Sequence, residues 1–262
     1  MITSAQNSKI KLARSLLSSK KERAATNSFV VEGIRLAEEA MHAGLAPEIV
    51  LYSSALSERG KNLLVNLDLL SNQIEEVEPG LLDRVSNTRT SQGILMILEK
   101  PLLEISRNPD PVLALDDIRD PGNLGTMLRS AWAAGFQAVL LTPQCAEAFS
   151  PKVVRAGMGA HFNLPIRTMG PLEIQAFCKK HSQPPLQILL ADAQKGQPCW
   201  DADLSDPLCL VIGSEAEGAG KSIRGIAEKN IFIPMQGDAE SFNAAVAAGI
   251  LMYEITRQRT AL

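Results

Sequence analysis

The sequence predicts an α/β protein of two units, the second of which contains a mostly parallel sheet. Two observations predict this class. Short apolar runs alternate with helical patterns along the chain, and a polar stretch with two prolines at 102–111 interrupts the alternation. Strands that alternate with helices pair in parallel beneath helices on both faces. We therefore expect a first domain over 1–101, a linker over 102–111 and a larger domain over 112–262.

The expected elements follow the apolar patterns in order. In the first domain, helical spacing of apolar residues predicts a helix over 4–21, and Gly44 ends a helix that begins at Glu32. Its other expected elements are strands at 29–31, 48–51, 75–77 and 93–98, helices at 61–70 and 81–85, and a polar loop at 86–92. In the second domain we expect strands at 112–115, 138–141, 163–166, 187–190, 208–212 and 231–233, helices at 123–134, 150–156, 172–181, 221–229 and 242–259, and an irregular segment at 194–206.

Composition narrows the class of protein. The chain has 262 residues, 45% of them hydrophobic, which is enough for a buried core. No apolar run approaches the ~18–20 residues of a membrane span, and the first residues lack the apolar region of a secretory signal. The four cysteines form no C-x-x-C pair and the three histidines are scattered, so we expect a cytoplasmic protein without a metal site.

Basic residues are concentrated near the N-terminus. Residues 1–28 carry a net charge of +5, whereas the remaining residues carry −8. A basic arm on an acidic body is typical of a contact with nucleic acid, although a solvated helix face explains it equally well. The six bases of this arm are Lys9, Lys11, Arg14, Lys20, Lys21 and Arg23.

A polar loop at 116–122 leads from the strand at 112–115 into the following helix. Asn123 can cap that helix through its side-chain oxygen. Arg129 lies six residues further on, so the two side chains lean apart by about 120° in a regular helix. Taken alone, the segment is also consistent with a capped helix that carries a surface arginine.

Two loops follow the last two strands. The first, GSEAEGAGKS at 213–222, ends like a phosphate-binding loop, but Glu215 replaces its first glycine. Its carboxylates would repel a triphosphate, so a nucleotide triphosphatase remains only as an alternative that predicts ATP binding there. In the second loop, Ser241 or Asn243 can cap the last helix. Loops at the ends of parallel strands form ligand sites, so we expect one small-molecule site built from both.

Taken in order, these segments resemble the motifs of the SpoU (TrmH-like) branch of the SPOUT RNA methyltransferases. The matching residues are Asp120-Pro121-x-Asn123-x-Gly125 with Arg129, Gly213-x-Glu215-x-x-Gly218, Ile233-Pro234-Met235-x-Gly237 with Ser241-Phe242-Asn243, and the final Arg257-Gln258-Arg259. Phe242 stands where the family usually has Leu, and Ala244-Ala245 stand where Val-Ser is common. Residues 2–11, 20–33 and 86–93 resemble the family's substrate-binding domain, which is similar to ribosomal protein L30e.

The resemblance implies a fold and an activity. It implies a SPOUT domain with a deep C-terminal trefoil knot, an L30e-like N-terminal domain, a homodimer with the active site near the subunit interface, and methyl transfer from S-adenosylmethionine to a ribose 2′-hydroxyl. The implied cofactor contacts are Gly213, Ile233, Met235, Gly237 and Phe242. The implied catalytic residues are Asn123, Arg129, Glu215, Ser241 and Asn243.

Family mechanisms often make the arginine a general base. Free arginine has a pKa above about 12, so our hypothesis is that Arg129 binds the target phosphate and stabilises developing alkoxide charge. Glu215, Ser241 and Asn243 would fix Arg129 and the ribose.

The RNA target is expected by analogy. The L30e-like domain favours ribosomal RNA over transfer RNA, and a non-catalytic RNA-binding protein with the same fold predicts no cofactor binding. The expected RNA contacts are Lys9, Lys11, Arg14, Lys20, Lys21, Arg23, Arg35 and Arg89.

Overall fold

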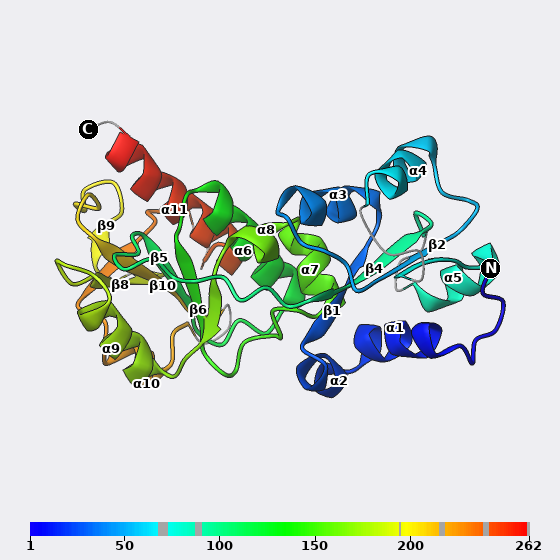
Figure 1. Ribbon diagram of the computed structural model, residues 1–262. Helices are drawn as coiled ribbons and strands as arrows, with labels where there is room; N and C mark the ends of the chain where they lie inside the picture. The colour runs from blue at the N-terminus through cyan, green and yellow to red at the C-terminus, as the bar shows by residue number, and fades with distance from the viewer. Residues whose placement is uncertain (68–72, 87–90, 194, 215–217, 238–240, 261–262) are drawn as a thin grey trace. The chain divides into compact units, whose positions relative to one another are not determined.

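The chain forms two compact units, each with its own sheet and core (Figure 1). The computed structural model describes residues 1–67, 73–86, 91–193, 195–214, 218–237 and 241–260. Unit 1 comprises Met1–Pro101 and Phe149–Phe162, and unit 2 comprises Leu102–Ala148 and Asn163–Leu262.

Unit 1 is built on a mixed four-stranded sheet with the order β1-β4-β2-β3. β4 pairs antiparallel with both β1 and β2, and only β3 runs parallel to β2, so the mostly parallel pattern does not extend to this unit. The strands are β1 (Ser28–Glu32), β2 (Ile49–Tyr52), β3 (Ile74–Glu76) and β4 (Ile94–Glu99). The helices are α1 (Ser8–Ser18), α2 (Lys20–Ala25), α3 (Ile34–His42), α4 (Glu58–Val65), α5 (Pro79–Val85), α7 (Pro151–Gly157) and α8 (Ala160–Asn163), which ends at the border with unit 2.

Both faces of this sheet are buried. Phe29 and Val31 of β1 join a core cluster with α3 and α4, whereas Val30 between them joins a cluster with α1 and α5. Figure 1 shows the two helix pairs on opposite sides of the sheet. Since successive side chains of a strand point to opposite faces, burial of both faces requires the continuous apolar runs that the sequence shows.

The segment at 149–162 belongs to unit 1, although the sequence predicts it within 112–262. Phe149 packs edge-on against Phe29, with ring centroids 5.1 Å apart. Val154 and Phe162 belong to the α3–α4 core cluster. An Arg155 Nη1 to Glu32 Oε2 contact of 2.6 Å adds an ion pair. Tertiary packing, which sequence order does not reveal, therefore decides where this segment lies.

Unit 2 contains a seven-stranded sheet with the order β7-β6-β5-β10-β8-β11-β9. All of its described pairings are parallel, which confirms the parallel sheet expected for the second domain. The strands are β5 (Val112–Leu115), β6 (Ala138–Leu141), β7 (Ile166–Thr168), β8 (Gln187–Asp192), β9 (Gln197–Pro198), β10 (Leu208–Ile212) and β11 (Lys229–Phe232). The helices are α6 (Pro121–Ala133), α9 (Pro171–Lys180), α10 (Lys221–Arg224) and α11 (Ala244–Thr260).

Helices also cover both faces of this sheet. A core cluster on one face joins the sheet to Ile174 of α9 and Ile223 of α10. α6 and α11 pack against each other, and Figure 1 shows them on the side opposite to α9 and α10. Because the strands run in the same direction, the polar loops that follow them lie together at one edge of the sheet.

Several expected elements are wrong in detail. The helix expected over 61–70 spans Glu58–Val65, and the segment expected to be irregular over 194–206 contains β9. The helix predicted over 4–21 is two helices, because Ser19 is extended and caps α2 by accepting a hydrogen bond from the Glu22 nitrogen. The helix predicted over 221–229 ends at Arg224, where Gly225, a poor helix former, follows. The strand predicted over 163–166 begins only at Ile166, because Pro165 cannot donate a ladder hydrogen bond.

No described helix is long and apolar enough to cross a membrane. Within the same residues, no group of three or more His, Cys, Asp or Glu side chains could hold a metal ion. Burial raises the pKa of the Cys145 and Cys199 thiols, which makes both poor nucleophiles at neutral pH.

Candidate active site

A cavity of about 350 Å³ lies where β8, β10 and β11 end and α11 begins. Its walls contain Gly213, Ile233, Met235 and Phe242, four of the five predicted cofactor contacts, together with Ser241. Gly237, the fifth, does not line the cavity. The position agrees with the rule that ligands bind at the carboxyl ends of parallel strands, and the volume is typical of small-molecule sites.

Gly213 forms a narrow part of this cavity wall. A Cβ atom at Gly213 would lie 2.2 Å from the Ala219 nitrogen, so no side chain fits. The chain folds back here, because the Ser214 and Gly218 nitrogens each donate to the other residue's carbonyl oxygen at 3.0 Å. Glycine at position 213 therefore lets the backbone of Gly218 and Ala219 pack directly against the end of β10.

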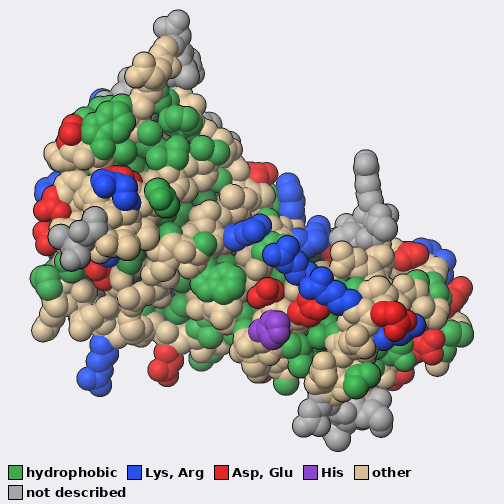
Figure 2. Space-filling model, turned by 90° about the horizontal axis from the view of Figure 1, so that it is seen from above, with side chains coloured by type: hydrophobic (Ala, Val, Ile, Leu, Met, Phe, Trp, Pro, Cys, Tyr) green, Lys and Arg blue, Asp and Glu red, His purple; other side chains and the backbone are tan. Residues whose placement is uncertain are grey.

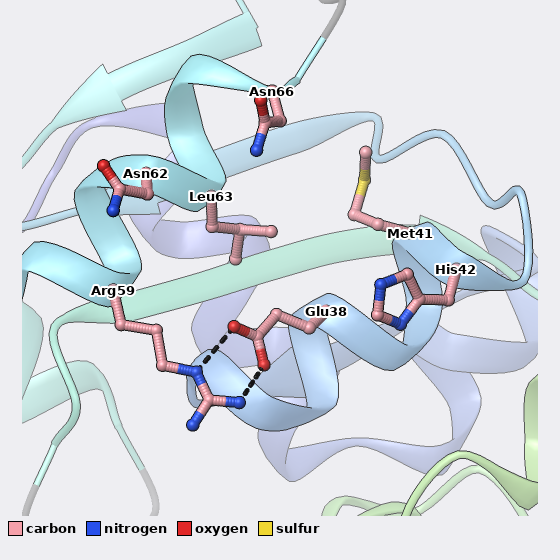
Figure 3. A pocket seen from close by; sticks show the side chains of 7 residues that line it. All are labelled: Glu38, Met41, His42, Arg59, Asn62, Leu63 and Asn66. Carbon is pink, nitrogen blue, oxygen red and sulfur yellow. Dashed lines mark hydrogen bonds and ion pairs between the residues drawn. The ribbon is translucent and has the colours of Figure 1, made fainter.

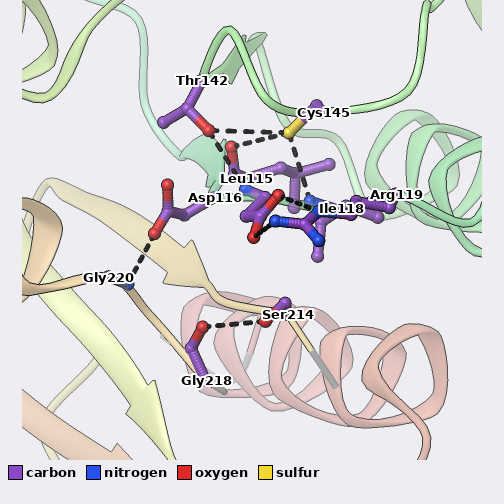
Figure 4. A network of polar contacts seen from close by, with 10 residues as sticks. Leu115, Asp116, Ile118, Arg119, Thr142, Cys145, Ser214, Gly218 and Gly220 are labelled. Carbon is purple, nitrogen blue, oxygen red and sulfur yellow. Dashed lines mark hydrogen bonds and ion pairs between the residues drawn. The ribbon is translucent and has the colours of Figure 1, made fainter. Parts of the chain in front are cut away.

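Asp116 joins the loop after β5 to the loop after β10 (Figure 4). Its carboxylate is buried, and Oδ2 accepts a hydrogen bond of 2.8 Å from the Gly220 nitrogen. The neighbouring Asp117 adopts a positive φ of 56°, and its nitrogen donates to Thr142 Oγ1 at 3.1 Å. Asp116 is not among the predicted site residues, and its position directly after a buried strand is the one sequence feature that marks it.

We expect Asp116→Ala to lower the free energy of unfolding by about 2 kcal/mol, because it removes a buried charge-assisted hydrogen bond. The β10 loop would lose an anchor, so affinity for a cavity ligand should fall as well. Urea denaturation and calorimetric titration measure the two effects. Asp203→Ala, which removes an exposed carboxylate from the same unit, is the control. Equal stability of the two variants would contradict the anchoring role.

The first and third motifs meet through two asparagines. Asn243 Nδ2 donates to Asn123 Oδ1 at 3.3 Å. Asn243 also caps α11, because its Oδ1 accepts from the nitrogens of Ala245 at 2.9 Å and Val246 at 3.2 Å. The cap fixes the Asn243 side chain and so positions the pair at the start of α11.

Asn123 itself is not the cap of α6, which corrects one prediction. α6 begins at Pro121, and Asp120 Oδ1 accepts a hydrogen bond of 2.8 Å from the Asn123 nitrogen. Proline suits the first helical position because its φ is already helical and its missing N–H needs no partner there. The Asn123 side chain is thus available for the contact with Asn243.

Arg129 lies exposed on α6. No hydrogen bond or ion pair joins its guanidinium to any residue that the structure describes. A cation without a protein partner can bind an anionic substrate group. Glu215 and Arg89, which the sequence also singles out, lie outside the described residues.

The predicted RNA contacts differ in exposure. Lys11, Arg14, Lys20, Lys21 and Arg35 are exposed. Lys9 is half-buried, and its Nζ lies 2.6 Å from Glu75 Oε1.

Arg23 is buried, and its guanidinium donates to the Leu16 carbonyl oxygen. The prediction that Arg23 contacts RNA is therefore wrong, because this side chain ties α2 to α1.

Unit 1 has a separate hollow of about 730 Å³ between α3 and α4 (Figure 3). Arg59 Nε and Nη2 contact the Glu38 carboxylate at 2.7 and 2.5 Å, and this pairing lowers the pKa of Glu38. None of the predicted site residues lines this hollow. Its two charges neutralise each other, so it lacks the converging functional groups of the unit 2 cavity.

The geometry defines a small-molecule site at the end of a parallel sheet, with an asparagine pair just before α11. Arg129 lies exposed on α6 of the same unit. The sequence profile of the SpoU rRNA Methylase family matches residues 110–253, and the chain belongs to this family. The profile of the MRM3-like substrate binding domain matches residues 7–96.

Characterised relatives are similar over nearly their full length. The 23S rRNA (guanosine(2553)-2′-O)-methyltransferase RlmP of Bacillus subtilis is 32% identical, with 97% of this chain and 98% of that protein covered. The SpoU methyltransferase AviRb of Streptomyces viridochromogenes, solved with AdoMet, superposes with a TM-score of 0.87 at 27% identity and covers 98% and 100% of the two chains. An AdoMet-bound rRNA methyltransferase from Sinorhizobium meliloti gives a TM-score of 0.82 at 30% identity, covering 98% and 97%.

Proposed function

We propose that this protein transfers the methyl group of S-adenosylmethionine to a ribose 2′-hydroxyl of ribosomal RNA in the cytoplasm. The observation that carries the proposal is the cavity that brings together Gly213 from the loop after β10 with Ile233, Met235 and Phe242 from the segment between β11 and α11. The names of the relatives, which include a 23S rRNA 2′-O-methyltransferase, favour ribosomal RNA over transfer RNA.

The described residues fit the cofactor. Ile233, Met235 and Phe242 supply apolar wall suited to an adenine ring, and Gly213 belongs to the same wall. Ser214 and Ser241 add hydroxyl groups to the same cavity. The bound cofactor would supply an electrophilic methyl carbon on sulfur, so the protein has mainly to bind, orient and stabilise charge.

The remaining polar residues act on the RNA in this proposal. The attacking 2′-hydroxyl must align with the methyl group and lose its proton as it reacts. Asn123 and Asn243 would hold the ribose through their linked amides. Arg129 would bind the adjacent phosphate and stabilise the developing alkoxide charge. Glu215 and Ser241 complete the proposed set.

We assign RNA binding to unit 1 as an L30e-like domain. Four exposed cations on α1 and α2 and Arg35 on α3 supply positive charge for phosphates. Arg89 is a further proposed contact. Neutralising phosphates releases counterions, so affinity for RNA should fall steeply with salt.

We further propose that unit 2 is threaded as a trefoil knot and dimerises through α11. Figure 2 views the molecule from the side of α11 and shows hydrophobic side chains gathered on unit 2. Val246, Ile250 and Tyr253 are 50%, 36% and 70% exposed on one helical stripe, and Trp200 beside them is 58% exposed. They line a hollow of about 510 Å³ that also contains Ile233 of the cofactor cavity. A second copy of the chain would bury this apolar stripe next to the active site.

Tyr253→Glu should weaken the dimer by about 100-fold or more, because a buried unpaired carboxylate is costly. Sedimentation equilibrium of the purified protein measures the change. Val65→Glu places the same acid on an apolar residue of unit 1 that is 83% exposed, and it should leave the association unchanged. An undisturbed dimer in Tyr253→Glu would exclude α11 as the interface.

The function itself is tested by mapping 2′-O-methyl groups in total RNA from cells with and without the gene. Loss of one site in ribosomal RNA is the expected result, and restoration by the wild-type gene completes it. Loss of a transfer RNA site instead would establish the alternative substrate. Full retention of every site, together with no cofactor binding by the purified protein, would indicate a non-catalytic RNA-binding protein.

A further inference from the structure

The cofactor cavity contains an ion pair that lies outside the three family motifs. Among the described lining residues, Asp192 is the one carboxylate and Arg224 the one cation. Arg224 Nη1 lies 2.8 Å from Asp192 Oδ2, and the two side chains are 41% and 10% exposed. Removing a carboxylate from water is costly unless it gains partners, so a largely buried acid in a ligand cavity needs an explanation.

Arg224 holds more than the carboxylate. Its Nε donates to the Ala219 carbonyl oxygen at 2.9 Å. A Cβ atom at Gly218 would lie 2.9 Å from Arg224 Nη2, so the guanidinium lies against the backbone of the β10 loop. Arg224 therefore connects the end of β8 to the loop after β10.

The Asp192 carboxylate is held in one orientation. The Lys195 nitrogen donates to Oδ1 at 3.1 Å, while Arg224 occupies Oδ2. Asp192 also lines the cavity, so its fixed carboxylate lies where a bound ligand can meet it. An acceptor that is fixed in this way discriminates between ligands. It cannot reorient to compensate when a ligand has no donor at the matching position.

Sheet order indicates which end of the cofactor meets Asp192. β8 and β5 flank β10 on opposite sides. Asn123, which belongs to the proposed reacting end, follows β5, whereas Asp192 ends β8. Asp192 thus lies on the side of β10 away from Asn123. The nucleoside part of the cofactor carries hydrogen-bond donors, namely the adenine amine and the ribose hydroxyls.

We propose that Asp192 binds a donor group of the cofactor's nucleoside and that Arg224 is a positioning residue, which fixes this carboxylate and the Gly218–Ala219 backbone. The inference rests on the proposed function, because it assumes S-adenosylmethionine as the ligand. Asp192 would set affinity for the cofactor and leave the reacting groups untouched.

The first experiment measures binding of S-adenosylhomocysteine to the full-length protein by calorimetric titration. Asp192→Asn keeps the shape and removes the charge, and it should weaken binding about 10-fold or more. Arg224→Met should cause a smaller loss. In steady-state assays the KM for the cofactor should rise while kcat changes little, since a contact made equally in the ground and transition states is removed. Unchanged affinity in Asp192→Asn would overturn the proposal.

The second experiment identifies the donor with two analogues, S-inosylhomocysteine, which lacks the adenine amine, and 2′,3′-dideoxy-S-adenosylhomocysteine, which lacks both ribose hydroxyls. The analogue that lacks the partner of Asp192 should bind less tightly to the wild type, but the loss should shrink in Asp192→Asn. If each analogue loses the same affinity on the wild type as on Asp192→Asn, the proposed contact is excluded. If Asp192→Asn does not fold, the affinities of the wild type alone test the contact. Binding of both analogues as tightly as S-adenosylhomocysteine would then also overturn the proposal.

Asp110→Asn is the matched control. It breaks an ion pair of 3.0 Å with Arg259 in the same unit, away from the cavity. It should lower the melting temperature without changing cofactor affinity. A wild-type protein that binds no S-adenosylhomocysteine would refute the proposed function, whereas a wild type and an Asp192→Asn variant that bind equally would refute only the present inference.

Discussion

Arg129→Ala is expected to lower the rate of methyl transfer by about 1,000-fold and to leave cofactor affinity nearly unchanged. Removing one charge-stabilising group from an active site costs about this much. The cofactor cavity is lined by other residues, so binding should persist. Single-turnover assays with a labelled methyl donor measure the rate, and calorimetric titration with S-adenosylhomocysteine measures the affinity.

The matched control for this variant is Arg119→Ala. Arg119 is an exposed arginine in the loop just before α6, where its Nε lies 2.7 Å from Asp117 Oδ1. Its loss should leave the rate within a few-fold of the wild type, because exposed ion pairs contribute little. Normal turnover by Arg129→Ala would remove this arginine from the active site.

Gly213→Ala is expected to have the second largest effect. The new Cβ would lie 2.2 Å from the Ala219 nitrogen and 2.4 Å from the Gly218 carbonyl carbon, so backbone must move. Overpacking of this kind costs about 1–3 kcal/mol. We expect that loss in the free energy of unfolding, together with loss of detectable cofactor binding, because the displaced loop forms the cavity wall.

Gly237→Ala separates the clash from a general intolerance of side chains in these loops. Gly237 has a positive φ of 76°, but no atom of the residues that the structure describes lies within 4 Å of its Cβ position. Only conformational strain of about 1 kcal/mol should result, and cofactor binding should remain. Equal losses of stability and of cofactor binding in the two variants would indicate a general intolerance of side chains in these loops and not a specific clash at Gly213.

The parallel sheet of unit 2 was predictable because its strands are short, fully apolar and separated by helical patterns. β10 over Leu208–Ile212 and β5 over Val112–Leu115 have the bounds that the sequence predicts. The mixed sheet of unit 1 was not predictable in the same way. Its antiparallel pairings depend on β4 inserting between β1 and β2, which is a long-range choice that periodicity does not record.

The cavity that we propose for the cofactor could be predicted from motifs, since four of the five expected contacts line it. Their order in the chain matched a known family, and that pattern carried the prediction. Asp116 and Asp192 lie outside the pattern and were missed, because an isolated acid after an apolar strand looks like ordinary loop polarity. The burial of Arg23 was also missed, because its contact with the Leu16 carbonyl oxygen arises from the turn between two helices.

The order of strands in unit 2 has a consequence for synthesis of the protein. β10 pairs with β5, which was made nearly a hundred residues earlier, and residues as late as Leu251 complete the cavity wall. Pairings this distant in sequence form slowly. A nascent chain can therefore complete this cavity only after α11 has emerged from the ribosome.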